Sequence, residues 1–202
     1  MLLFHASAVE LASVLIAVTV AITVHEFAHA WRADRAGDPT PRAAGRLTLN
    51  PIAHFDPIGS LLFLLVGFGW AKPVPVNPAN FRHPRRDGMW VGLWGPLSNF
   101  LLAAAAGVLI RVVGHAGTSG LHTLLQIFTL LNLNLGVFNL IPLPPLDGSH
   151  ILSGMLDSRQ AYAYEMWGRR YGFIALLAFL YVGFRYVFAF VVLPLYRLLT
   201  GF

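Results

Sequence analysis

The 202-residue sequence contains no cysteine and few charged residues. The absence of cysteine excludes disulfides and thiolate metal ligands, so a metal ion could be held only by His and carboxylate side chains. Charged residues make up 11% of the chain, whereas a typical soluble domain has about 25%. Hydrophobic residues make up 56%, and the mean hydropathy is +0.64. This composition excludes an ordinary soluble domain and indicates an integral membrane protein.

Positive charge exceeds negative charge and is unevenly distributed. The chain has 14 Lys and Arg residues against 9 Asp and Glu, a formal net charge of +5. Most of the basic residues lie in three polar stretches, residues 32–56, 71–88 and 157–170. Loops on the cytoplasmic side of a membrane carry such an excess, so the basic character does not indicate a nucleic-acid partner. We expect all three stretches on the cytoplasmic side.

The apolar segments predict an all-α polytopic membrane protein with about four transmembrane helices. The run 57–70 has about fourteen residues, too few for a helix that crosses a bilayer. Because it also lies between two cytoplasmic stretches, we expect a short re-entrant or hairpin segment there. Arg185 interrupts the last crossing, which could be one helix or two pieces. The predicted crossings, the first of which starts on the outer side, are residues 9–31, 89–113, 121–141 and 171–199.

An HExxH pattern formed by His25, Glu26 and His29 lies near the end of the first crossing. Two His residues four positions apart lie on one face of a helix and can share a metal ion. The Glu between them can act as a general base toward water that the metal activates. The motif alone is a moderate signal, but its place in a membrane-compatible segment indicates hydrolysis inside or at the edge of a bilayer.

The third metal ligand has to come from elsewhere in the chain, because a catalytic zinc site needs three protein ligands and an open position. The nearest carboxylates, Asp34 and Asp38, lie in an Arg-rich polar stretch. Asp147 is the better candidate, since it lies in a long apolar region where an unpaired charge is costly. The proline cluster at 142–145 cannot continue a regular helix and would turn this carboxylate toward a partner. Alternatively, Asp147 caps a helix that starts near Ser149.

Three motifs together resemble those of the site-2 proteases, a family of intramembrane zinc metalloproteases. They are HExxH at residues 25–29, GRxTLNPxxHxDPxG at 45–59 and NxxPxPxLDG at 139–148. The run 69–77 and a Gly-Pro-Leu-Ser-Asn turn at 95–99 are also similar to a compact prokaryotic branch, without PDZ or CBS domains. The resemblance covers nearly the whole chain and implies a single integral-membrane metalloprotease domain, residues 1–202.

The resemblance implies one Zn²⁺ ion per chain, held by His25, His29 and Asp147, with Glu26 as base and proton shuttle. Asn139 would steady the oxyanion, since a neutral amide can stabilise developing negative charge in a low-dielectric site. It could equally bond carbonyls that the prolines leave free. The implied reaction is hydrolysis of peptide bonds within or near transmembrane segments of membrane protein substrates (regulated intramembrane proteolysis). It would take place toward the cytoplasmic side of a prokaryotic cell membrane.

Four further residues are candidates for a substrate-binding or auxiliary role. His54 could approach the zinc ion or the substrate backbone, or it could pair with Asp56. An extended substrate could add as a strand to an exposed edge near Val74 and Val76. Asn99 belongs to the predicted turn and is an auxiliary candidate on the resemblance.

Two other functions are open. A membrane protease of the CAAX-processing type takes a Glu from a later helix as third ligand, and the later Glu here, Glu165, lies in a polar stretch. A metal-binding scaffold or transporter could use His25, His29 and Asp147 as a transit site and would not need Glu26 as a base. The partners that we expect are a transmembrane substrate, the lipid bilayer and a regulatory membrane protein. The sequence does not determine the oligomeric state.

Overall fold

The computed structural model describes residues 6–66, 69–113 and 119–201. Throughout these ranges the regular secondary structure is helical, with no β-strand. Phe55 and Ala71 form an isolated antiparallel bridge. The prediction of an all-α protein is confirmed.

Among the described residues, four helical spans are long and apolar enough to cross a membrane, as predicted. The last of them begins at Ser158, so the polar stretch 157–170 is helical rather than a link. Two π-helical turns interrupt this span, which is therefore continuous but not a plain α-helix. The spans are α1 (Ala8–Arg35), α4 (Pro84–Val113), α5 (Ser119–Asn139) and Ser158–Thr200, built from α7 (Ser158–Ala178), Phe179–Gly183, α8 (Phe184–Val187), Phe188–Val192 and α9 (Leu193–Thr200).

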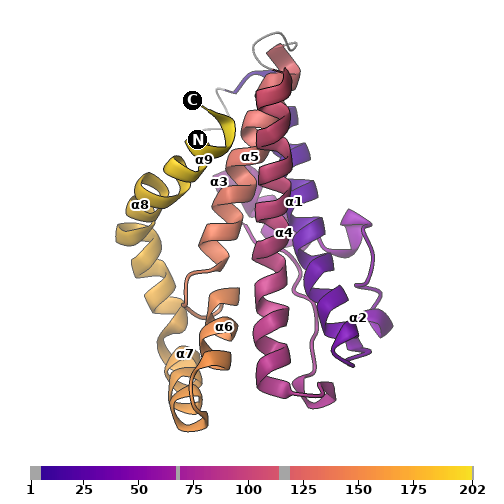
Figure 1. The fold of residues 1–202 in the computed structure, drawn as a ribbon, viewed down its shortest axis with the longest axis vertical. Coiled ribbons are helices and arrows are strands. Elements are labelled where there is room, and N and C mark those ends of the chain that lie inside the picture. The colour runs from indigo at the N-terminus through magenta and orange to yellow at the C-terminus, as the bar shows by residue number, and fades with distance from the viewer. Residues whose placement is uncertain (1–5, 67–68, 114–118, 202) are drawn as a thin grey trace.

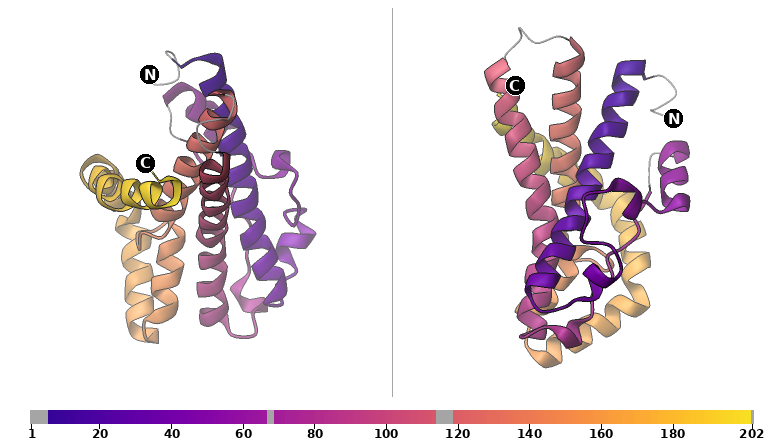
Figure 2. Two further views of the ribbon diagram at one scale, coloured as in Figure 1. Left: turned by 45° about the horizontal axis from the view of Figure 1, so that its top comes forward. Right: turned by 90° about the vertical axis from the view of Figure 1, so that its right-hand side faces the viewer.

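Helices α1, α4 and α5 lie side by side as a bundle, and α6 (Asp147–Met155) packs beside α4 (Figures 1 and 2). The span α7–α9 stands to one side of this bundle and contacts α4 through α9, and α5 through both α9 and the turn Phe188–Val192. Buried apolar side chains from both parts meet there: Ala103, Leu133, Val137 and Val192. The last span therefore closes one side of the three-helix bundle.

The three basic stretches lie at one end of the molecule. In Figure 1, α2 (Thr40–Ala43), the start of α4 and the start of α7 are all at the lower end. The end of α4 and the start of α5 are at the upper end, and so is the start of α1 (Figure 2). This arrangement agrees with basic stretches that share one side of a membrane.

The short apolar run after the first basic stretch forms α3 (Pro57–Val66) and then returns to its starting side. Asp56 starts the helix, since its Oδ1 accepts hydrogen bonds from two backbone N–H groups of the first turn (2.8 and 3.0 Å). After the return, the Lys72 N–H donates to the His54 carbonyl (2.9 Å), just before the helix. The segment returns to the side from which it starts, as predicted for a hairpin, and its insertion into the membrane stays a prediction; residues 67–68 lie outside the described residues.

Candidate metal centre

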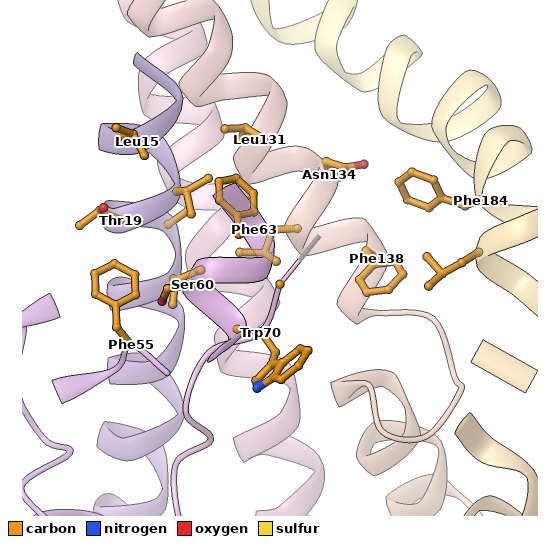
Figure 3. Close-up of a pocket in the computed structure, with 17 residues that line it drawn as sticks. Leu15, Thr19, Phe55, Ser60, Phe63, Trp70, Leu131, Asn134, Phe138 and Phe184 are labelled. Atoms are coloured by element: carbon orange, nitrogen blue, oxygen red, sulfur yellow. The ribbon is translucent and has the colours of Figure 1, made fainter. Parts of the chain in front are cut away.

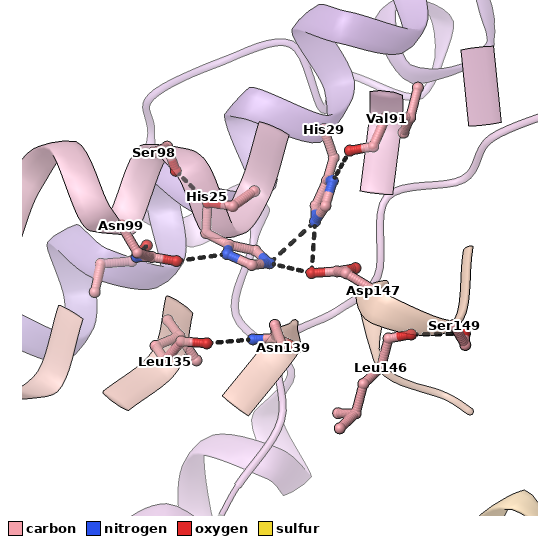
Figure 4. A network of polar contacts seen from close by, with 12 residues as sticks. His25, His29, Val91, Ser98, Asn99, Leu135, Asn139, Leu146, Asp147 and Ser149 are labelled. Atoms are coloured by element: carbon pink, nitrogen blue, oxygen red, sulfur yellow. Dashed lines mark hydrogen bonds and ion pairs between the residues drawn. The ribbon is translucent and has the colours of Figure 1, made fainter. Parts of the chain in front are cut away.

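Two imidazoles of α1 and a carboxylate of α6 converge between the helices (Figure 4). His25 and His29 are both buried, with 6% and 8% of their surfaces exposed. Asp147, the first residue of α6, places its Oδ2 3.1 Å from His25 Nε2 and 3.3 Å from His29 Nε2. The two Nε2 atoms are 3.0 Å apart. In the described part of the chain, no other cluster of His and carboxylate side chains could hold a metal ion.

The other ring nitrogens show where the protons are. His25 Nδ1 lies 2.6 Å from the Asn99 side-chain oxygen, and His29 Nδ1 lies 2.7 Å from the Val91 backbone carbonyl. Both of these oxygens only accept hydrogen bonds. Each imidazole therefore carries a proton on Nδ1, and in the neutral ring this leaves the lone pair of Nε2 directed at Asp147.

A buried chain of amides fixes the orientation of Asn99. Its Nδ2 donates to the Ala21 carbonyl (3.2 Å) and to Asn132 Oδ1 (3.0 Å). The Asn132 amide in turn donates to the Phe128 carbonyl (2.9 Å). Both Asn side chains are fully buried. Since Nδ2 is committed to acceptors, the Asn99 oxygen is the atom that faces His25.

Three atoms with free electron pairs thus face one another with no hydrogen between them. Asp147 Oδ2 is buried, and no group in the described residues donates a hydrogen bond to it. Burying such atoms together is costly unless a cation lies among them. Zinc bonds of about 2.0–2.2 Å in tetrahedral geometry put ligands about 3.3–3.5 Å apart, close to the observed spacing. Two nitrogens and one carboxylate oxygen also leave a fourth position open, so these residues fit a catalytic zinc ion.

Helix α4 provides the space around the imidazoles as well as their acceptors. Val91, Gly95 and Asn99 are spaced four residues apart and therefore share one face of the helix. A Cβ atom at Gly95 would collide with the His29 ring and would lie 2.8 Å from Cε1 of His25. The absence of a side chain at Gly95 is therefore a condition for the metal centre.

The sequence at residues 95–99 is part of α4, so the prediction of a turn there is wrong. The turn was implied by the resemblance, and Pro96 does remove one backbone N–H from the helix. In a membrane bundle, neighbouring helices hold a helix together at such a residue. Pro96 is fully buried in this structure, and the motif shapes a helix face rather than a chain reversal.

Comparison with known proteins identifies the family of the chain. The sequence model of peptidase family M50 matches residues 107–180. "Putative zinc metalloprotease YwhC" of Bacillus subtilis (strain 168) is 43% identical over 171 residues, which cover 81% of this chain and 77% of YwhC. The chain belongs to peptidase family M50.

Two other relatives have lower identity or shorter coverage than YwhC. "Putative zinc metalloprotease Rip2" of Mycolicibacterium smegmatis is 28% identical over 80% of this chain and 63% of its own length. "Zinc metalloprotease MJ0392" of Methanocaldococcus jannaschii is 35% identical over 39% of this chain and 23% of its own length. No solved structure matches the chain. The resemblance to the site-2 proteases is confirmed at the level of the family. The names of these relatives specify zinc, and the group of two His and one Asp side chains fits a zinc ion.

A bent segment before α6 sets the direction of Asp147 in this M50 chain. Residues 140–146, which include the proline cluster, form turns between α5 and α6. Gly148 packs so closely on the backbone carbonyls of residues 140 and 141 that a Cβ atom would collide with both. The N-cap of α6 is Leu146, and no side chain caps the helix. The alternative prediction, that Asp147 is a helix cap, is therefore wrong.

Glu26 and Asn139, the two residues predicted to act on the substrate, differ in the hydrogen bonds that their side chains already make. Glu26 is partly exposed on α1, and its carboxylate makes no hydrogen bond within the described residues. Asn139 donates from Nδ2 to the Leu135 carbonyl of its own helix (3.0 Å). An amide has two N–H bonds, so Asn139 keeps one for another acceptor. Its part in the reaction stays a prediction.

Two other candidate ligands lie outside the metal centre. His54 is fully buried, and its Nε2 lies 2.8 Å from the Thr48 carbonyl. It does not pair with Asp56, which caps α3; a role of His54 toward the substrate stays a prediction. Glu165 accepts a hydrogen bond from Ser153 Oγ (2.7 Å) at an exposed position. The CAAX-type arrangement, which needs that Glu as third ligand, is therefore not formed.

A cavity of about 700 Å³ lies one helical turn along α1 from the metal centre (Figure 3). It lies between α1, α3, α5 and the last span, and its lining is mainly apolar. Ala21 and Ile22 line it one helical turn before His25, and Phe138 lines it next to Asn139. An apolar space of this size near a metal centre can accept a segment of a membrane-embedded chain.

Three contributors to the site were not predicted. The Val91 carbonyl could not have been, because every residue has one. The need for Gly95 follows from the packing of α4 on α1, which the sequence does not contain. Asn132 did leave a signal, since an amide within an apolar membrane helix calls for a partner. Asn99, predicted as auxiliary, lies behind His25.

Proposed function

We propose that this M50 chain is a zinc metalloendopeptidase that hydrolyses peptide bonds within or near transmembrane segments of membrane proteins. The observation that carries the proposal is the convergence of the His25 and His29 Nε2 atoms with the Asp147 carboxylate near an apolar cavity. Both imidazoles belong to a membrane-spanning helix. Such a site serves a substrate that reaches it from the bilayer. The proposal includes regulated intramembrane proteolysis as the process.

The chain's own groups supply the proton transfers. When bound, zinc would polarise the scissile carbonyl and lower the pKa of water to about 7. Glu26 would take a proton from the attacking water on a carboxylate oxygen and give it to the leaving amine nitrogen. Its lack of a hydrogen-bond partner suits this role. The second N–H of Asn139 could donate to the developing oxyanion.

An extended segment at the end of the re-entrant region is a candidate place for the substrate backbone. A transmembrane helix hides its carbonyls in internal hydrogen bonds, so it must unwind before it is cut. Val74 and Val76 make no backbone hydrogen bonds within the described residues. Buried Arg46 donates to the carbonyls of residues 72 and 73 and holds the segment in place. An unwound substrate could add here as a strand.

We propose that the metal centre lies toward the cytoplasmic side of a prokaryotic cell membrane. The support is the gathering of the basic stretches at one end of the molecule, which is typical of cytoplasmic loops. His25 and His29 lie in the half of α1 nearer to that end. A regulatory membrane protein could control access, and the substrate's identity is open.

The test is cleavage of a panel of single-span membrane proteins by the purified chain in lipid vesicles. Wild type and Glu26→Gln are compared, and bound zinc is measured in both. We expect about one zinc per chain in both proteins and a loss of at least about 10²-fold in cleavage rate in the variant, since a general base contributes that much or more.

Two outcomes would contradict the proposal in different ways. Full cleavage by Glu26→Gln would remove this residue as the base. Bound zinc without cleavage by wild type, for every substrate in the panel, would favour a metal-handling protein. Zinc transport that survives Glu26→Gln would then identify a transit site, because transport needs no base.

A further inference from the structure

The last span carries a cation in the middle of its apolar stretch. Arg185 lies on α8 and is exposed. The nearest cations on either side along the span are Arg170 and Arg197, 15 and 12 residues away. At a rise of about 1.5 Å per residue, they are about 22 and 18 Å from Arg185. Measured along the helix, which bends and includes two π-helical turns (Figures 1 and 2), the two distances together are comparable to the thickness of a bilayer with its headgroups, about 40 Å. This spacing puts Arg170 and Arg197 at the two membrane surfaces and Arg185 near the centre.

The packing of α8 agrees with this depth. The ring of Phe184 meets that of Phe138 of α5 edge to face, with centroids 5.9 Å apart. Val187 and Phe188 pack on a buried cluster that includes Leu133 and Val137 of α5. In Figure 1, α8 lies between the two ends of the molecule, far from both. The Arg185 side chain therefore projects from a helix that runs beside a membrane-spanning one.

Arg185 has a tyrosine as neighbour but no carboxylate. Its Nη2 donates to the Tyr186 hydroxyl (2.6 Å), and its guanidinium lies 4.6 Å from the centroid of that ring. No ion pair within the described residues includes it. Glu26 and Asp147 belong to the metal centre, and Glu10 is bonded to Ser7 at the start of α1. The other carboxylates lie outside the four crossings predicted from hydropathy: Asp34, Asp38, Asp56, Asp87, Asp157 and Glu165.

A guanidinium at the centre of a bilayer is costly unless it is paired or faces water. Arg185 is too far from either surface for its side chain to reach the headgroups. A second copy of the chain would not pair with it, because no carboxylate is free at this depth. We propose that the exposed face of α8 docks a transmembrane helix of another protein, which carries an Asp or Glu near the middle of the membrane and pairs with Arg185.

The surroundings of Arg185 suit a helix as partner. Tyr181, four residues before it, is 88% exposed, and Phe190, five residues after it, is 75% exposed. The rings of Tyr186 and Phe190 stack almost parallel, at 4°. These aromatic side chains give a partner helix a broad apolar contact on both sides of the ion pair. The same span lines the cavity through Leu180 and Phe184, so a partner bound here would contact the wall of that cavity.

The test measures association of the full chain with a synthetic single-span peptide in phosphatidylcholine vesicles, by energy transfer between fluorophores at pH 8. The peptide is a Leu-Ala helix with one Glu at its centre, and the matched peptide has Gln there. Because close charge pairs couple by more than 1.4 kcal/mol, we expect the Glu peptide to bind at least about tenfold tighter. Arg185→Gln should abolish the difference, and Arg185→Lys should keep most of it.

A matched control and four contrary outcomes make the test decisive. Arg169→Gln removes a cation at the membrane surface and should leave the preference for Glu intact. Equal binding of both peptides to the wild type, or a preference that persists in Arg185→Gln, overturns the proposal. So does energy transfer between two copies of the chain that depends on Arg185, which would make a second copy the occupant. Loss of the preference when phosphatidylglycerol is added would identify a lipid phosphate as the occupant and overturns it too. None of these readouts depends on proteolysis.

Discussion

His25 keeps its proton on Nδ1 because the Asn99 oxygen lies 2.6 Å away and can only accept it. Without that acceptor, the neutral ring could carry its proton on Nε2, the atom that faces Asp147. A protonated Nε2 cannot bind a metal ion. Partners behind metal-binding imidazoles are often carboxylates, whereas here they are an amide and a backbone carbonyl. The chain thereby avoids a further buried charge in the membrane.

Asn99→Ala should weaken zinc binding by about 10–100-fold, the usual effect of losing a group that orients a ligand. The measurement is competition with a chelator of known affinity. Because the ligands themselves remain, cleavage should return when zinc is raised above the new dissociation constant. Asn134→Ala is the matched control, because it removes a side chain of the same type from α5 instead of α4. The Asn134 Oδ1 has no hydrogen-bond partner within the described residues. Unchanged zinc affinity in Asn99→Ala would contradict the orienting role.

The re-entrant element brings an extended backbone to the side of the bundle that holds the cavity. Phe55, Phe63 and Trp70 from this element line the cavity together with α1 and α5 (Figure 3). Val74 and Val76 follow Trp70 by four and six residues along the chain. If a substrate pairs with this segment, their N–H groups matter more than the side chains.

Val74→Pro and Val76→Pro should abolish cleavage while zinc stays bound, because proline removes the N–H that a substrate strand would use. Val74→Ala and Val76→Ala keep the N–H and should retain most of the activity. Val76 also packs on a buried cluster with Ala33 and Phe81, so its alanine variant shows how much of the loss comes from packing. Cleavage retained in both proline variants would exclude strand addition at this segment.

The helix bounds show what hydropathy can and cannot predict. All four crossings were predicted because long apolar runs have few other structures in a membrane. The ends of these helices were not predicted, since a helix continues beyond its apolar run into polar sequence where capping groups complete its backbone hydrogen bonds. α4 starts at Pro84, five residues before the predicted start, and Pro is favoured in a first turn. Asp157 and Gln160 form a capping box at the start of α7, a readable signal of a helix start in a polar stretch outside the predicted crossings.

The metal ligands were predictable because their chemistry lies in the side-chain type and spacing. His25 and His29 share a helix face by their four-residue spacing, and Asp147 was singled out by its apolar surroundings. What surrounds them depends on which helices meet, and that follows from three-dimensional packing. The sequence therefore predicts the ligands of the site but not the face of α4 that holds them.

The molecule as a whole carries most of its basic residues at one end, and this predicts its orientation. The chain contains no cysteine, so a single cysteine can be placed at will and labelled with a membrane-impermeant maleimide in intact cells. Ala44→Cys, Arg82→Cys and Arg159→Cys, at exposed sites in the three basic stretches, should react only after the cells are permeabilised. Ala8→Cys, at the start of α1, should react in intact cells.

Mixed labelling would contradict this orientation. If Ala44→Cys and Arg82→Cys reacted from opposite sides, the segment between them would cross the membrane and would not be re-entrant. If all four positions reacted in the reverse sense, the metal centre would lie toward the outer surface. Each variant must still bind zinc for its labelling to count, which checks that the fold is intact.

Helices α1 and α4 meet at the metal centre through residues that have the same spacing on both helices. One carries His25 and His29, the other Val91, Gly95 and Asn99, and both sets repeat every four residues. A slide of α4 by a single residue would move it about 1.5 Å and turn its face by about 100°. Both acceptors and the gap at Gly95 would then be lost at once. The amount of bound zinc therefore reports the register between these two helices. A change that shifts this register would release the metal before the helix bundle unfolds.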